Sequence, residues 1–79
     1  MATEKLDIWW STLTVKEKVR IATKIARISN PDAPEQNYPD CTDVWQNSAE
    51  ELKVKVYEHC TDDHGLLIPK WQEGFPQSY

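Results

Sequence analysis

Two cysteines and two histidines are the residues in this chain with the chemistry to bind a metal ion. Cys41 stands near the start of one expected helix, and His59, Cys60 and His64 stand at or beyond the end of the next. If these helices run antiparallel, the four side chains gather at one end. Three interpretations stay open: inert buried thiols beside solvent-facing imidazoles, a disulfide between the two cysteines, and a zinc site with Cys41, Cys60 and His64 as weak candidates. Because the sequence has no C-x-x-C spacing, we favour the first and expect no cofactor.

Asp62, Asp63 and His64 place carboxylates beside an imidazole, a combination that general acid–base catalysis uses. No serine or cysteine stands next to them with a base to activate it, as nucleophilic catalysis requires. Cys60 and His64 are four residues apart, but Gly65 indicates that the helix has already ended, so the two are not fixed as a dyad. We therefore expect no catalytic residues and predict that the protein is not an enzyme.

Positive charge follows one side of an expected helix over residues 15–28. Its four members, called the basic stripe here, are Lys16, Arg20, Lys24 and Arg27, and they lie opposite an apolar face. The simplest interpretation is a solvated helix face, and the partner it would suit best is an acidic protein. Nucleic acid is the less favoured partner, because the whole chain has a formal charge of −4. The charge is also uneven, +3 over residues 1–30 and −7 over residues 31–79.

The chain has four tryptophans, and two of them occupy matching positions. Trp10 and Trp45 are expected to form the centre of the core. Trp9, Trp71 and Phe75 are less constrained by helical spacing, so we expect them to be exposed and to bind a partner. A homodimer that buries the surface around Trp9 and Trp71 is a further possibility.

Helical spacing and capping signals predict four short helices, over residues 3–12, 15–28, 40–47 and 49 to about 59. Thr14 with Glu17, and Ser48 with Glu51, have the spacing of capping boxes. The two halves match at an offset of 35, and the two capping boxes match at 34. We predict an all-α bundle in one domain, residues 1–79, built as two pseudo-repeated αα-hairpins. Its parts are hairpin one (about 3–29), a proline-rich connector (30–39), hairpin two (about 40–61) and an extended C-terminal segment (62–79) packed across them.

A chain of 79 residues makes one domain, and it has neither the apolar run of a membrane span nor that of a secretory signal. We therefore expect a cytoplasmic protein with reduced cysteines and no membrane partner. The predicted function is a small non-enzymatic protein-interaction or regulatory module. The alternatives are a nucleic-acid-binding protein that uses the basic face of the helix over 15–28, and a small zinc-stabilised module.

Overall fold

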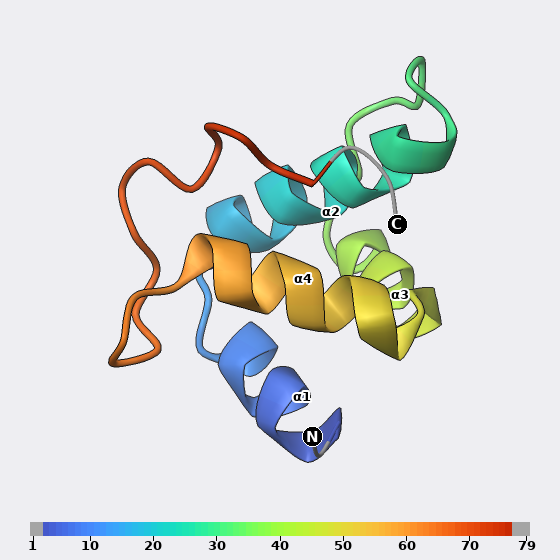
Figure 1. Ribbon diagram of the computed structural model, residues 1–79. Coiled ribbons are helices and arrows are strands. Elements are labelled where there is room, and N and C mark those ends of the chain that lie inside the picture. The colour runs from blue at the N-terminus through green and yellow to red at the C-terminus, as the bar shows by residue number, and fades with distance from the viewer. Residues whose placement is uncertain (1–2, 77–79) are drawn as a thin grey trace.

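Four α-helices account for most of the computed structural model, which describes residues 3–76 (Figure 1). They are α1 (Thr3–Ser11), α2 (Val15–Ser29), α3 (Asp40–Asn47) and α4 (Glu50–Cys60). Within these residues there is no strand, and one isolated antiparallel bridge joins Thr61 to Leu67. The predicted all-α bundle of four short helices is confirmed. The ends of the predicted domain, residues 1–2 and 77–79, lie outside the described residues.

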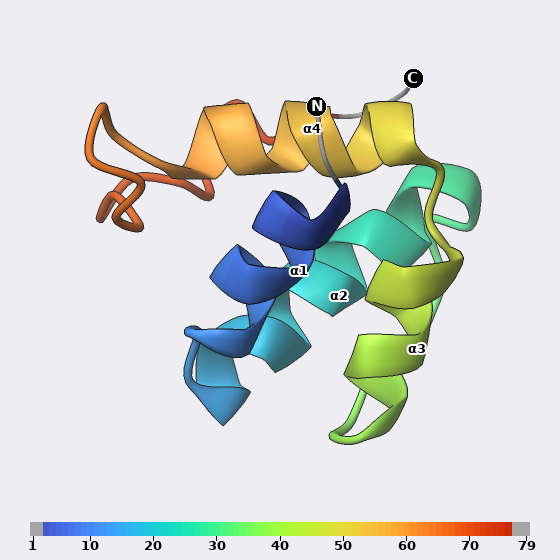
Figure 2. The same cartoon turned by 90° about the horizontal axis from the view of Figure 1, so that it is seen from below.

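The helices pack closely across the two halves of the chain. α2 packs against α3, and α1 packs against α4. Figures 1 and 2 both show α1 under α4, whereas the predicted hairpins would pair α1 with α2 and α3 with α4. This difference has a physical reason in the core, where an indole of α1 stacks on an indole of α3. The stack brings α1 and α3 together through their side chains. As a result, α2 packs on α3 and α4 packs on α1.

Three tryptophans form the centre of the core. Trp45 is fully buried, and its ring lies nearly parallel to that of Trp10 with centroids 4.9 Å apart. Trp9 meets Trp45 at 5.6 Å in a tilted arrangement. The indole N–H of Trp10 donates to the hydroxyl of Thr42 (3.4 Å), and that of Trp45 donates to a carboxylate oxygen of Asp7 (3.3 Å). The core therefore satisfies its buried polar groups, as large indoles require.

The start of α2 is confirmed in detail, and the start of α4 differs from the prediction. The Thr14 hydroxyl accepts a hydrogen bond from the Glu17 amide (3.2 Å), and the Glu17 carboxylate accepts one from the Thr14 amide (3.0 Å). The second predicted capping box is wrong, because α4 begins after Ala49, which provides no side-chain cap. The Ser48 hydroxyl instead donates to the Val44 carbonyl (2.8 Å) and so satisfies the end of α3.

The two helix junctions nevertheless share their local geometry. The Leu13 amide donates to the Trp10 carbonyl, and the Ser48 amide donates to the Trp45 carbonyl, both at 3.1 Å. The N-cap residues that follow, 14 and 49, are both extended. Tryptophans and N-caps thus correspond at one offset of 35 residues. The internal repeat of the whole hairpins stays a prediction.

After α4, the chain turns at Gly65 and returns along the helices, as the orange-to-red trace in Figure 1 shows. Trp71 and Phe75 of this segment are buried in the core, and Leu66 is exposed. The His59 ring N–H donates to the Trp71 carbonyl (2.9 Å), and the Ile68 amide donates to the Cys60 carbonyl (2.9 Å). These contacts fix the returning segment to the end of α4. Of the helices within residues 3–76, none combines the length and apolar character needed to cross a membrane.

Candidate functional site

The basic stripe lies on the outer side of α2. Its position follows from the helical period, because the apolar residues Ile21, Ala22 and Ile25 turn inward and are buried. Lys16, Arg20 and Arg27 are exposed, and Lys24 is half-buried. α2 therefore presents an ordered row of cations to the solvent.

Arg20, Lys24 and Arg27 line one depression in the surface, with a volume of about 330 Å³. We call it the basic depression, and its other lining residues are Thr23, Glu35 and Gln72. Lys16 belongs to the stripe but does not line the depression. Among these lining residues Glu35 carries the only negative charge, so the depression has three cations against one carboxylate.

Side-chain hydrogen bonds hold the connector against this part of α2. The Arg27 Nε–H donates to the Ala33 carbonyl (2.9 Å), a bond that leaves the terminal NH₂ groups of the guanidinium to other acceptors. The buried Thr23 hydroxyl donates to the Val19 carbonyl (2.7 Å) and accepts from the Gln36 amide (2.9 Å). The connector is thereby held in place, and it carries Glu35 to the edge of the depression.

A smaller recess adjoins the basic depression and shares two of its cations. Lys24 and Arg27 line this recess, of about 180 Å³, together with Ile28, Phe75 and Pro76. The Lys24 ammonium lies 5.8 Å from the centre of the Phe75 ring, a cation–π distance. Cationic and apolar surface therefore lie side by side where the returning C-terminal segment meets α2.

The predicted exposure of three aromatic side chains is wrong. Trp9, Trp71 and Phe75 are only 6%, 5% and 3% exposed. Trp9 is enclosed by Trp45 and Tyr57, and the other two pack on each other at 6.0 Å. The physical reason is the return of the C-terminal segment, which covers apolar surface that helical spacing alone leaves open. Trp9 and Trp71 therefore expose no surface through which a homodimer could form.

The structure does not assemble the three weak zinc candidates into a site. Cys41 and Cys60 are free and fully buried, whereas His64 is exposed. Burial raises the pKa of the Cys60 thiol to about 12, which opposes the thiolate form that binds metals. In the part of the chain that the structure describes, no group of three or more His, Cys, Asp or Glu residues is placed to hold a metal ion.

The carboxylate of Asp62 is bound within a turn. It accepts hydrogen bonds from the backbone amides of Leu66 (3.0 Å) and His64 (2.8 Å). These two bonds lower the pKa of Asp62, because they stabilise its ionised form. Asp62 is therefore a turn-forming residue, and its neighbour His64 contributes a backbone amide to that turn.

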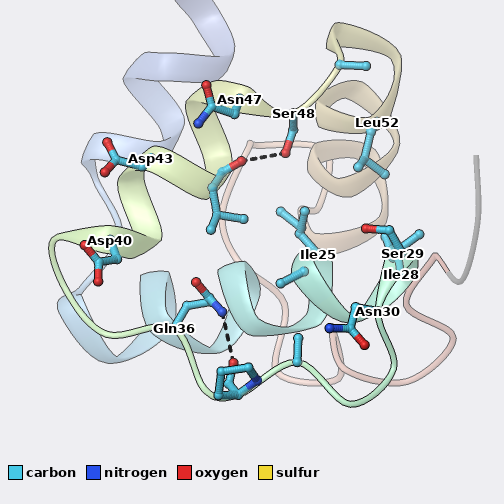
Figure 3. Close-up of a pocket in the computed structure, with 15 residues that line it drawn as sticks. Ile25, Ile28, Ser29, Asn30, Gln36, Asp40, Asp43, Asn47, Ser48 and Leu52 are labelled. Atoms are coloured by element: carbon cyan, nitrogen blue, oxygen red, sulfur yellow. Dashed lines mark hydrogen bonds between the residues drawn. The ribbon is translucent and has the colours of Figure 1, made fainter.

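A larger groove, of about 770 Å³, lies between α2, α3, the first residues of α4 and the connector (Figure 3). We call it the α2–α3 groove. Its aliphatic lining consists of Ile25, Ala26, Ile28, Ala33, Val44, Ala49 and Leu52. Sequence reasoning missed this groove, because its walls come from four segments that are apart in the chain. The only local signal is the proline-rich connector, which cannot continue α2 and so has to leave its end.

No protein-family model, curated protein or solved structure matches this chain. The charge and shape of the basic depression and of the α2–α3 groove are therefore the basis on which a function can be argued.

Proposed function

We propose that this protein is a small non-enzymatic interaction module that binds an acidic segment of a protein partner. The docking surface is the basic depression of α2, lined by Arg20, Lys24 and Arg27. The observation that carries the proposal is that these three cations line one concavity, which a carboxylate-bearing segment can enter. Arg27 is already fixed through its Nε–H, so it loses less side-chain entropy on binding than a free arginine does.

Charge supports a partner that is locally acidic. Arginine and lysine side chains bind carboxylates by charge-assisted hydrogen bonds, and complementary potentials speed the encounter of the two proteins. The cations lie within residues 1–30, which have a formal charge of +3, whereas residues 31–79 have a formal charge of −7. A partner is therefore oriented on approach, with its acidic segment directed to α2.

The neighbouring recess favours a protein segment over nucleic acid. Ile28 and Pro76 are partly exposed and offer apolar contact right beside Lys24 and Arg27, above the buried Phe75 ring, which suits a carboxylate-rich segment with one apolar side chain. Nucleic acid is a poorer fit, because the chain has a net charge of −4 and Glu35 lies in the depression itself. The proposal places the protein in the cytoplasm, where its thiols stay reduced.

Affinity capture from a lysate of the source cells, performed with and without nuclease treatment, tests the proposal. The bait is compared with the double charge reversal Arg20→Glu/Lys24→Glu. The matched control is Lys55→Glu/Lys70→Glu, which reverses two exposed cations outside α2. Far-UV circular dichroism verifies that all three baits are folded.

The expected result is a protein that the wild type and the control capture and that Arg20→Glu/Lys24→Glu does not. Its captured amount should fall as salt rises, because exposed charges are screened beyond about 8 Å at physiological ionic strength. Capture that survives the reversal at positions 20 and 24 contradicts the proposed docking surface. Loss of the captured protein on nuclease treatment assigns the stripe to nucleic acid instead.

A further inference from the structure

The α2–α3 groove has two carboxylates at one end and aliphatic side chains along the rest of its lining, interspersed with uncharged polar ones. Asp40 and Asp43, from the first turn of α3, stand at one end of the groove in Figure 3. Ile25 lies near the middle of the groove, and Leu52, Ile28, Ser29 and Asn30 lie toward the other end. The residues that line the groove include these two carboxylates and no Lys, Arg or His. The groove is thus opposite in charge to the basic depression.

Within residues 3–76, no hydrogen bond or ion pair neutralises the two carboxylates. Among the described residues, none of the side-chain hydrogen bonds involves the carboxylate of Asp40 or Asp43. Both residues are exposed. Their position at the start of α3 suits the helix dipole, and this accounts for two acidic residues in that turn without a ligand. It does not account for the groove beside them, in which eight of the fifteen lining residues are apolar.

The connector separates this groove from the basic depression. Pro34 and Gln36 line the groove, whereas Glu35 between them lines the depression. The Gln36 side-chain NH₂ donates to the Pro34 carbonyl (3.0 Å), and the Gln36 backbone amide donates to the Thr23 hydroxyl (2.9 Å). This wall is therefore fixed to α2, and the two concavities are separate surfaces on either side of it.

We propose that the α2–α3 groove is a second docking site, for a short protein segment that carries a large aliphatic side chain and a lysine or arginine close to it. The aliphatic side chain would lie against Ile28, Val44 and Ala49, which are partly exposed aliphatic residues of the lining, and the cation would face Asp40 and Asp43. The groove volume, about 770 Å³, falls in the range of about 300–1,000 Å³ typical of ligand sites. It accommodates a few side chains of a segment, and charge complementarity selects a basic one.

A random 12-residue peptide library displayed on phage is the probe, and the immobilised full chain is the target. The expected selection is for peptides that combine Lys or Arg with Leu, Ile or Met. Selected peptides are then synthesised, and their affinities are measured by fluorescence anisotropy. Replacing the large aliphatic residue of a peptide by alanine should weaken its binding about tenfold.

The protein variant Asp40→Asn/Asp43→Asn removes both charges and keeps the size of the side chains. It should weaken the selected peptides about fivefold or more at low salt. The matched control Glu58→Gln/Asp63→Asn removes two exposed charges that do not line the groove, and it should leave the affinity unchanged. Arg20→Glu/Lys24→Glu should also leave it unchanged, so the groove can fail while the proposed function of the basic depression stands, and the reverse.

Several outcomes overturn the groove proposal. These are the selection of acidic peptides, an absence of enriched peptides, and selected peptides that bind Asp40→Asn/Asp43→Asn as tightly as the wild type. Light scattering tests one other occupant, the basic stripe of a second copy of this chain. A molar mass that rises with concentration and returns to the monomer in Asp40→Asn/Asp43→Asn would assign the groove to self-association and contradict a separate partner.

Discussion

Truncation of Trp45 is the most informative perturbation of the fold. Its side chain is fully buried, stacks on Trp10 at 4.9 Å and also contacts Trp9 at 5.6 Å. Trp45→Ala removes these contacts and leaves Asp7 without its indole donor. Replacing a buried aromatic residue by alanine costs about 3–5 kcal/mol of unfolding free energy. A domain of 79 residues has about 4–12 kcal/mol in total, so about a quarter of its stability or more should be lost.

Urea denaturation followed by far-UV circular dichroism measures this loss. With a denaturant slope of about 1–1.5 kcal/mol/M, suitable for a small domain, the midpoint should fall by about 2–5 M or the transition should disappear. Trp45→Phe keeps an aromatic ring against Trp10 and should cost clearly less than alanine. It therefore keeps the test informative if Trp45→Ala does not fold.

Ile8→Ala is the control, because Ile8 belongs to α1 but is 57% exposed. It should change the unfolding free energy by no more than about 0.5 kcal/mol. A loss below about 1 kcal/mol for Trp45→Ala, or a loss for Ile8→Ala of equal size, would refute the inference that the helices are organised around the indole stack.

Four further predictions concern the turn after α4, the buried thiol and metal removal. Hydrogen bonds lower the folded-state pKa of Asp62 below its unfolded value of about 4. The ionised carboxylate therefore stabilises the fold fully above that pH, and this contribution is lost as the pH falls through the folded pKa. The urea midpoints of wild type and Asp62→Asn should therefore converge at low pH. Gly65→Ala should lower the unfolding free energy by about 1–2 kcal/mol in thermal melts, since φ is +77° and the added Cβ would lie 3.2 Å from the Tyr57 hydroxyl. Burial raises the Cys60 pKa to about 12. The neutral thiol therefore stabilises the fold fully below the unfolded pKa of about 8.5, and this contribution is lost as the pH rises toward 12. The folded protein should not react with Ellman's reagent at pH 8 but should react in urea. EDTA should leave the far-UV spectrum and the urea midpoint unchanged, and a lower midpoint would restore the zinc alternative.

The helices could be predicted from the sequence because their signals are local. The capping box of Thr14 and Glu17 and the spacing of apolar residues place α2 within one residue of its observed end. The equivalent signal at Ser48 and Glu51 misled the prediction for a local reason as well. A serine between two helices can cap the second or satisfy the end of the first, and here its hydroxyl bonds to Val44.

The exposed aromatic surface could not be judged from the sequence, because burial there depends on distant segments. The C-terminal segment is predicted to pack across the helices, but a glycine and a proline near Trp71 and Phe75 interrupt any helical period, so the sequence does not indicate which side chains face inward. The segment is held to the end of α4 through His59 and Ile68. Trp9 is covered by Tyr57, which is 48 positions away in the chain. The period of a helix gives the direction of a side chain but not the element that meets it.

The candidate surfaces divide in the same way. The cations of the basic stripe share one helix, so the spacing of Arg20, Lys24 and Arg27 was enough to place them together. The basic depression also needs Glu35 and Gln72, and the α2–α3 groove needs residues from α2, the connector, α3 and α4. Concavity arises from the packing of these segments, and no single stretch of sequence encodes it.

The most direct test of the proposed docking surface is a chemical-shift map of the ¹⁵N-labelled protein, titrated with the purified protein that it captures. We predict that the amide shifts concentrate at Arg20, Lys24 and Arg27 and at the adjoining Phe75, and that Arg20→Glu/Lys24→Glu abolishes them. Shifts confined to the exposed side of α4 or to the turn at Asp62, with the α2 amides unchanged, would contradict the assignment of the basic depression as the binding site.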